Sequence, residues 1–367
     1  MEALLSRRAA LNEDQYIVNP EVTALVEDLV SQAKAAFSDR QYALHGGEVR
    51  LLWAAQRAFR ADAGIGPTGS HEITISYGAG SEIYRDAFVL TEFCAHHFND
   101  SRYDEIYDAL DYDGRRDVLP DGLSVEAAKI NIMRTTLHWL YLHEQAHLFQ
   151  GHGNVAEAVG AGTLLGDNLT IMEMAVAGAA PLEGRDAAVR HAFELAADHE
   201  ATNLMIASLA TTPGPLAIRD LWCFTVGAMC LFFLFDDESG TPIGSAAKGT
   251  HPPPAMRMRL LIRQILWFVQ NTSVRAHVGP LHDLEFAAKV MEHATVTATM
   301  YWQIRYLEQR DGLPTFLEST THPQSVPEPY RQQIFEIWKE LRPLIVAEHL
   351  GWGEASILEI ETPDSLA

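Results

Sequence analysis

The chain is strongly acidic: it has 27 Lys and Arg against 49 Asp and Glu, a formal net charge of −22 with the histidines neutral. Nucleic acids and anionic membranes are bound chiefly through clustered Lys and Arg, so this balance excludes both as expected partners. The 367 residues, of which 47% are hydrophobic, are enough for the large core of an ordinary globular protein.

The first third of the chain is expected to be helical with one strand. Its first residues place charges around a very short apolar patch, which is not typical of a secretory signal. Apolar residues at helical spacing predict helices over residues 19–37, 47–61 and 81–98. Residues 71–77 instead alternate polar and apolar side chains, which is typical of a strand with one buried face.

The three cysteines and the longest apolar run indicate where in the cell the protein is expected. Cys94, Cys223 and Cys230 form no disulfide framework, so a reducing compartment and a cytoplasmic location are expected. The longest run without a charge covers residues 221–235, whereas a helix that spans a bilayer needs about 20 apolar residues. This run therefore predicts a buried core helix and no membrane span.

The most informative segment is a His-Glu-x-x-His motif formed by His143, Glu144 and His147. Apolar residues at helical spacing lead into it from Ser124, a good N-cap, and Gly151 follows as a helix stop. The two histidines project from neighbouring turns, so both rings can reach one metal ion at about 2.0–2.1 Å. Imidazoles in an apolar helix are costly to bury without a partner, and a metal ion supplies one. Glu144 can then take a proton from a metal-bound water.

A catalytic zinc site needs a third protein ligand, and a later predicted helix offers one. Glu194 and Asp198 are four residues apart and can face the same way. Glu194 is then the third ligand, and Asp198 holds a ligand histidine by its other ring nitrogen. His191 lies on the same face and is the competing third ligand. His152 is expected to lie off the ligand face and to be exposed.

Three elements in this order resemble the gluzincin zinc metallopeptidases, in which a glutamate on a later helix completes the zinc site. The first two are the His-Glu-x-x-His motif and the Glu-x-x-Ala-Asp segment that begins at Glu194. The third, Thr250-His251-Pro252 followed by Arg257, is similar to a segment of the CAAX prenyl endopeptidase and heat-shock membrane protease group. The likeness covers about residues 124–260. Because members of that group carry long transmembrane helices, soluble relatives such as the Lit-type phage-exclusion peptidases are an equally open comparison.

The resemblance implies a role for each matched residue. Glu144 is the general base, Asp198 supports the site, and Arg257 supports the glutamate helix through an acidic partner. His251 lies near the zinc as a second-shell or transition-state group. The implied ligands of the Zn²⁺ ion are His143, His147 and Glu194.

The expected fold is mainly α with a small β element, an α+β zincin-like arrangement in which the His-Glu-x-x-His helix packs against the helix of Glu194. Residues 1–123 form an N-terminal helical region, 124–271 a zincin-like catalytic core and 272–367 a C-terminal helical region, or all three form one continuous domain. An edge strand near 72–78 either pairs with the backbone of a bound peptide or is a structural strand. Further helices are expected over residues 216–235, 254–271, 281–309 and 329–350.

The expected function is zinc-dependent hydrolysis of peptide bonds in a protein or peptide substrate, with Glu144 activating a zinc-bound water. His251 is the first choice for an oxyanion donor, with Tyr301 and Tyr330 as alternatives. A di-iron carboxylate bundle would need a second Glu-x-x-His motif, and the chain has none. The remaining alternative is a metal-stabilised regulatory or binding protein that does not cleave. Glu144 argues against it, because structural zinc sites are closed by four ligands and need no general base.

Overall fold

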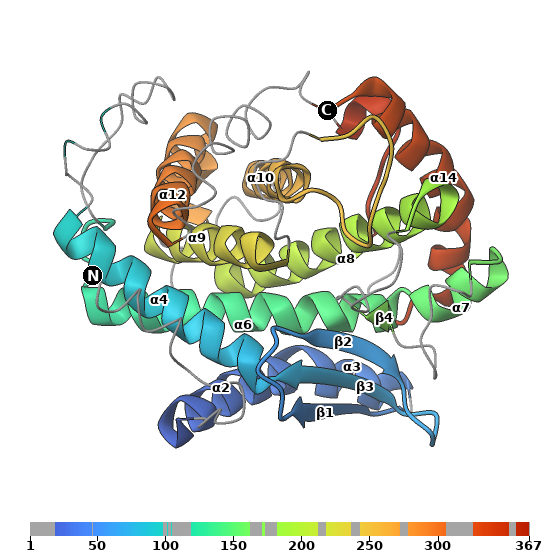
Figure 1. The fold of residues 1–367 in the computed structure, drawn as a ribbon, viewed down its shortest axis with the longest axis horizontal. Coiled ribbons are helices and arrows are strands. Elements are labelled where there is room, and N and C mark those ends of the chain that lie inside the picture. The colour runs from blue at the N-terminus through green and yellow to red at the C-terminus, as the bar shows by residue number, and fades with distance from the viewer. Residues whose placement is uncertain are drawn as a thin grey trace.

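A single long helix, α6 (Val125–Phe149), runs through the middle of the molecule (Figure 1). A small sheet lies along one side of it, and the helices α8 (Gly184–Thr211) and α9 (Ile218–Phe235) lie along the other. The fold is mainly α with a small β element, as expected. The structure is a computed structural model that describes residues 19–45, 47–97, 101, 104, 119–161, 171–172, 182–211, 218–235, 243–271, 278–305, 326–351 and 357–366.

Helix α6 begins and ends where the sequence predicts. The Ser124 hydroxyl accepts a hydrogen bond from the backbone N–H of Ala127 at 3.2 Å, which satisfies one of the free donors of the first turn. Gly151 adopts a left-handed backbone with φ of 60°, which ends the helix. Every residue from Trp139 to Phe149 is buried, because helices and strands cover α6 on all sides.

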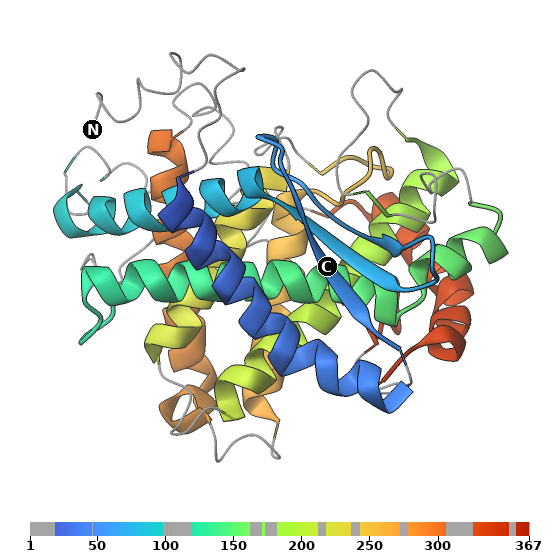
Figure 2. The ribbon, with the colours of Figure 1, turned by 90° about the horizontal axis from the view of Figure 1, so that it is seen from below.

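The sheet has the strand order β1-β3-β2-β4. Strand β3 pairs in parallel with β1 and antiparallel with β2, and β2 pairs antiparallel with β4. Figure 2 shows that the sheet and helix α2 (Pro20–Ala33) both lie across α6. The strands are β1 (Val49–Ala54), β2 (Ala61–Ile65), β3 (His71–Ser76) and β4 (Ile171–Met172).

Two expectations about this region are wrong. Residues 47–61 form no helix: β1 occupies their middle and pairs with β3 from Val49 opposite His71 to Ala54 opposite Ser76. The strand expected near 72–78 exists, but it is not an edge strand, because β3 lies between β1 and β2. Its backbone groups are therefore already paired within the sheet and are not open to a peptide.

The remaining N-terminal helices extend beyond their expected limits. Helix α2 continues through a π-helical turn, Lys34–Ser38, into α3 (Asp39–His45). Asn19 caps the start of α2 through its side-chain oxygen, and Pro20 occupies the first helical position. Helix α4 (Tyr77–His97) follows β3 directly.

The expected C-terminal helices are confirmed within the described residues; residues 216–217 and 306–309 lie outside them. Two hydrophobic clusters make up the core, and α8 contributes to both, with Ala201 in the larger and Ala196 in the smaller. In the described part of the chain, no helix is both long and apolar enough to cross a membrane. The confirmed helices are α9, α10 (Pro254–Gln270), α12 (Leu284–Arg305) and α14 (Glu328–Glu348), whereas α7 (His152–Ala158), which follows α6, was not predicted.

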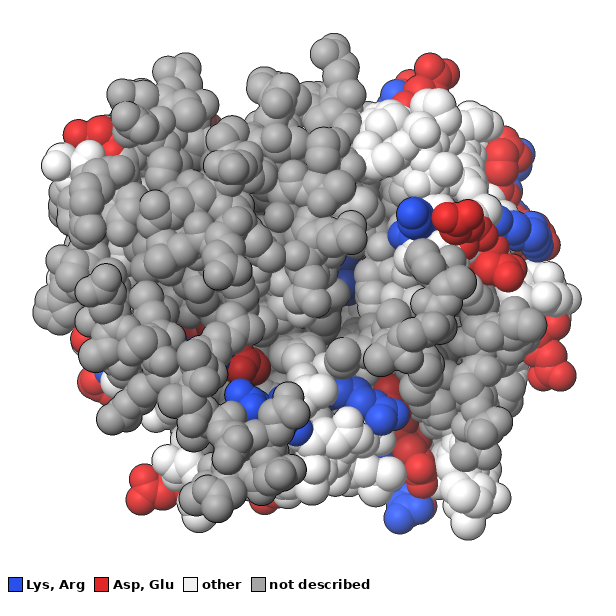
Figure 3. Space-filling view, in the orientation of Figure 1, with Lys and Arg blue, Asp and Glu red and all other residues white. Residues whose placement is uncertain are grey.

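The described part of the surface carries charges of both signs. On the face in Figure 3, acidic and basic side chains lie next to one another, most clearly at the rim where Figure 1 places α14. Ion pairs such as Arg185 with Glu340, whose guanidinium and carboxylate lie 2.6 Å apart, account for part of this mixing.

Candidate metal centre

Helices α6 and α8 pack side by side and bring three potential metal donors together. His143 and His147 come from neighbouring turns of α6, and Glu194 comes from the facing side of α8. All three side chains are buried. Among the described residues these are the His, Cys, Asp or Glu side chains that group closely enough to hold a metal ion. The sequence predicted the same three residues.

The spacing of the donor atoms fits a small tetrahedral ion. The Nε2 atoms of His143 and His147 lie 3.1 Å apart. Glu194 places Oε2 at 3.3 Å from Nε2 of His143 and Oε1 at 3.6 Å from Nε2 of His147. Donors bound tetrahedrally at about 2.0–2.1 Å from zinc would stand roughly 3.3 Å apart. Neither buried oxygen of Glu194 makes a well-aligned hydrogen bond within the described residues. Buried polar atoms usually have such a bond, and a bound cation would take its place.

Glu194 is held in its charged form. Burial by itself raises the pKa of its carboxyl, but the surrounding groups lower it more, so the net pKa lies well below the ordinary value. Two buried guanidinium groups also face it, because Arg190 and Arg257 each place a nitrogen 3.8 Å from a Glu194 oxygen. A charged carboxylate is the form that binds a cation.

His143 is supported by a buried ion pair. Its Nδ1 lies 3.0 Å from Oδ1 of Asp198. Arg257 donates two hydrogen bonds to the same carboxylate, from Nε at 2.7 Å and from the terminal nitrogen at 2.6 Å. Burial raises the pKa of Asp198, but Arg257 and then His143 lower it more, so the net pKa is below the usual value. The structure places Asp198 and Arg257 where the sequence predicted, and the ring of Trp139 stacks on His143 at 5.3 Å.

His147 is supported by a residue that the sequence reasoning placed wrongly. His152 is buried, not exposed, and its Nδ1 lies 2.7 Å from Nδ1 of His147. The expectation failed because it extended the spacing of α6 beyond its end. The left-handed Gly151 turns the chain, and α7 begins at His152 with its ring next to the last turn of α6. In the sequence, Gly151 directly before His152 indicates this change of direction.

Behind His152 lies a further set of buried polar groups. Nε2 of His152 lies 2.9 Å from Oε1 of Gln150, and Nε2 of Gln150 donates to Oε2 of Glu200 at 2.7 Å. Nε2 of His349, at the end of α14, lies 3.2 Å from Oε1 of Glu200. Glu200 is fully buried in this network.

The two residues expected to act on a substrate are Glu144 and His251. Glu144 is buried and follows His143 directly on α6. His251 precedes α10 and places Nε2 at 3.8 Å from Oε2 of Glu194. Its Nδ1 lies 2.9 Å from the hydroxyl of Thr250. Burial lowers the pKa of His251 to about 3, so its ring is neutral at pH 7.

The competing candidates have other partners. His191 is buried, but its Nδ1 lies 2.9 Å from the Tyr330 hydroxyl, and it does not belong to the group of potential donors. Tyr301 donates to Oδ1 of Asp86 at 2.6 Å. Arg190, which the sequence analysis did not single out, is buried beside the centre; it precedes Glu194 by four residues, a spacing that places both on one face of α8.

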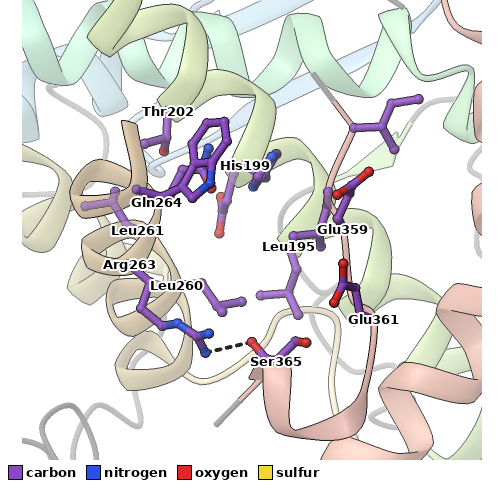
Figure 4. A pocket seen from close by; sticks show the side chains of 14 residues that line it. Leu195, His199, Thr202, Leu260, Leu261, Arg263, Gln264, Glu359, Glu361 and Ser365 are labelled. Carbon is purple, nitrogen blue, oxygen red and sulfur yellow. Dashed lines mark hydrogen bonds between the residues drawn. The ribbon is translucent and has the colours of Figure 1, made fainter. Parts of the chain in front are cut away.

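Two hollows adjoin the centre. One, of about 240 Å³, is lined by His147 together with residues of β2 and the ends of α6 and α14. The other, of about 470 Å³, lies between α8, α10 and the C-terminal segment, with Leu195, Leu260 and Glu359 in its wall (Figure 4). Asp198 also lines this hollow. Arg263 donates to the backbone oxygen of Ser365 at 2.7 Å within this second hollow.

Comparisons of the chain with known protein families, with curated proteins and with solved structures find no match. What the protein does is therefore inferred from the residues of the centre.

Proposed function

We propose that the protein is a zinc-dependent peptidase of the gluzincin type, and that His143, His147 and Glu194 hold the ion. The observation that carries the proposal is the donor set: two imidazole nitrogens and one carboxylate, 3.1–3.6 Å apart, buried between two helices. Two histidines and a glutamate are a known ligand set of catalytic zinc sites, which keep a fourth position open. A zinc ion held in this way polarises a carbonyl group and lowers the pKa of water, which is the chemistry that amide hydrolysis requires.

Glu144 is the general base in this proposal. Its carboxylate accepts a proton from the attacking water and delivers it to the nitrogen of the departing amine. Glu144 follows His143 on α6 and is not one of the three grouped donors, so it would act near a bound ion without being its ligand. Arg190 lies near Glu194, and Arg257 pairs with Asp198. These positive charges offset part of the negative charge of the two carboxylates.

His251 stabilises the oxyanion that forms on the substrate. For this role the ring needs its proton on Nε2, on the side that faces Glu194, and Nδ1 then accepts from the Thr250 hydroxyl, 2.9 Å away. An N–H donor at this position can bind the developing negative charge of a tetrahedral carbon centre. The substrate is a protein or peptide, in keeping with the resemblance to metallopeptidases.

A second function, a metal-stabilised binding protein that does not cleave, is favoured by one observation. His143, Glu144, His147 and Glu194 are all buried. A closed structural zinc site would have four protein ligands, whereas the described residues group three. Glu144 also has no role in a site that only binds.

The test is zinc content together with cleavage. Purified protein should hold one zinc ion and cut an unfolded protein in a reaction that a chelator stops. Glu144→Gln should keep the zinc and lose about 10²–10⁴-fold in rate, because it removes only the proton transfer. Glu126→Gln, an exposed glutamate in the first turn of the same helix, is the matched control and should cleave normally. New protein termini in cell lysates, read by mass spectrometry, would identify the substrates.

The possible results separate the two functions. Zinc in the protein with no cleavage by the wild type supports the binding protein. Equal cleavage by wild type and Glu144→Gln removes the peptidase proposal, since hydrolysis would then come from elsewhere. Absence of zinc from the wild type at micromolar free zinc would remove both.

A further inference from the structure

A chain of hydrogen bonds leads away from one of the proposed ligands through buried side chains of four helices. It runs from Nδ1 of His147 to Nδ1 of His152 at 2.7 Å, and from Nε2 of His152 to Oε1 of Gln150 at 2.9 Å. Gln150 donates to Glu200 at 2.7 Å, and Nε2 of His349 lies 3.2 Å from the same carboxylate. All of these groups except part of His349 are buried, so water does not compete for the bonds.

The direction of the chain follows from its far end. Nε2 of Gln150 faces two acceptors, Oε2 of Glu200 and the backbone carbonyl of Ala196 at 3.1 Å. A carbonyl oxygen can only accept, so this end of the amide is its NH₂ group. The other end, Oε1, is then an acceptor, and the proton in its bond to His152 belongs to Nε2 of the imidazole.

This fixes the two histidines in turn. A neutral imidazole has one donor and one acceptor nitrogen, so His152, with its proton on Nε2, accepts at Nδ1. His147 must therefore donate from Nδ1. Both rings are buried and in direct contact, so two positive charges there would repel each other without water to solvate them. The lone pair of His147 is left on Nε2, the atom that faces Nε2 of His143 and the carboxylate of Glu194.

We propose that His152 and Gln150 are positioning residues that keep His147 in the Nδ1–H form, so that Nε2 is ready to bind a metal ion before the ion arrives. The competing form would carry the proton on Nε2 and donate it to Nε2 of His143 at 3.1 Å, a longer contact than the 2.7 Å between the Nδ1 atoms of His147 and His152. That form would block two metal donors at once. The hydrogen-bond chain disfavours it, because the Nδ1 atoms of His147 and His152 would then face each other as two acceptors. The function of this device rests on the proposed metal centre, but the proton positions rest on the protein's own hydrogen bonds.

The first test reads the protons directly in the metal-free protein. Long-range ¹H–¹⁵N correlation spectra of histidine-labelled protein distinguish the two neutral forms of each ring. We expect the proton on Nδ1 of His147 and on Nε2 of His152. A proton on Nδ1 of His152 would overturn the proposal, whether or not the protein binds zinc.

The second test measures zinc affinity by competition with a chelator. His152→Leu removes the acceptor and should weaken zinc binding by about 10–100-fold, the usual effect of losing a group that orients a ligand. His152→Asn should restore most of the affinity, because Oδ1 of asparagine can accept at the place of Nδ1. His191→Leu is the matched control: it removes another buried histidine, on α8, whose partner is Tyr330, and should leave the affinity unchanged.

A purely structural role for His152 predicts a different pattern. The His152→Leu protein would then unfold more easily without metal, yet bind zinc as tightly as the wild type, and the proposal would be wrong. If His152→Leu does not fold, Gln150→Met replaces a side chain of similar length one bond further along and should weaken zinc binding in the same way. Failure of the wild type itself to bind zinc would instead refute the proposed function, and the spectra would still decide the proton positions.

Discussion

The two histidines of the candidate metal centre are held by different chemistry. His143 faces a carboxylate, Asp198, which carries its own counterion in Arg257. His147 faces a neutral ring, His152, and the nearest carboxylate of that network, Glu200, lies two hydrogen bonds further away. A carboxylate in place of His152 would need a counterion of its own, because burying an unpaired charge costs several kcal/mol. His152, the neutral support, orients the ring of His147 without adding a charge to the centre.

The largest expected effect comes from the residue that both histidines face. Glu194→Ala should reduce zinc affinity by far more than the about 10–100-fold typical of a supporting group, because it removes a direct donor. His191→Ala, one turn away on α8, should leave most of the zinc in place. Zinc content by atomic absorption after dialysis measures both. A larger loss of zinc in His191→Ala than in Glu194→Ala would mean a three-histidine site. The comparison of two supported histidine ligands would then no longer apply.

Asp198, the charged support of His143, should destabilise the fold strongly when its counterion Arg257 is removed. Arg257→Ala leaves Asp198 buried without its counterion, which typically costs about 3–5 kcal/mol. Urea unfolding of the metal-free protein measures the loss. Arg263→Ala, an exposed arginine of the same helix, should cost no more than about 1 kcal/mol.

The ion pair should also show coupling in a double-mutant cycle. The losses of Arg257→Ala and Asp198→Ala should fall short of adding by roughly 0.5–3 kcal/mol, since both belong to one buried network. The same cycle should appear in zinc affinity, because Asp198 contacts His143. Strictly additive losses would mean that Arg257 supports the fold but not the ligand.

The two supports should weaken in different pH ranges. The pKa of His152 is lowered on folding, so below about 6.5 the unfolded chain binds a proton that the folded chain does not, and stability falls as the pH drops. The pKa of Asp198 is also lowered, so its contribution is complete above about 3.9 and is lost only as the pH falls through its folded value.

Urea unfolding of the metal-free protein at pH 7, 6 and 5 tests this difference. In His152→Leu the slope of stability against pH should be smaller than in the wild type by up to about 1.4 kcal/mol per pH unit, one proton's worth. Asp198→Asn should lose stability almost equally at pH 7 and pH 5. Equal slopes in the wild type and His152→Leu would show that His152 does not titrate with unfolding.

The smallest effect is expected from the turn that places His152. Gly151→Ala puts a side chain at φ of 60°, which costs about 1–2 kcal/mol. The added Cβ would also stand 2.7 Å from Cβ of Glu348, so one of the two segments must move. Thermal unfolding should show the loss, and zinc affinity should fall with it because His152 shifts. Unchanged zinc affinity in a destabilised Gly151→Ala protein would show that the neutral support tolerates displacement.

The sequence was most informative where one helix fixes the spacing. The positions of His143, His147, Glu194 and Asp198 follow from the period of two helices, and the structure brings them together with Arg257, for which the family likeness was the guide. His251 also lies where that likeness implied, near Glu194. Each of these expectations depends on local geometry or on a motif, both of which are present in the sequence.

The errors arose where distant pairing decides. Residues 49–54 contain Leu51, Leu52 and Trp53 without clear alternation, and only the partner strand β3 makes them a strand. Once β1 was missed, β3 had no partner on that side and was expected at an edge. His152 was misplaced for a similar reason, because its position depends on a change of direction at Gly151 and not on the period of α6.

The connection between α6 and α7 has a consequence for how this chain can vary. Surface loops generally accept insertions and deletions, because the elements they join do not depend on their length. Here Gln150 and Gly151 span the whole distance from the end of α6 to His152, and Gln150 itself bonds to His152. One residue more or less would turn His152 by about 100° relative to His147 if α6 were simply lengthened or shortened. This link can therefore change by substitution but not in length.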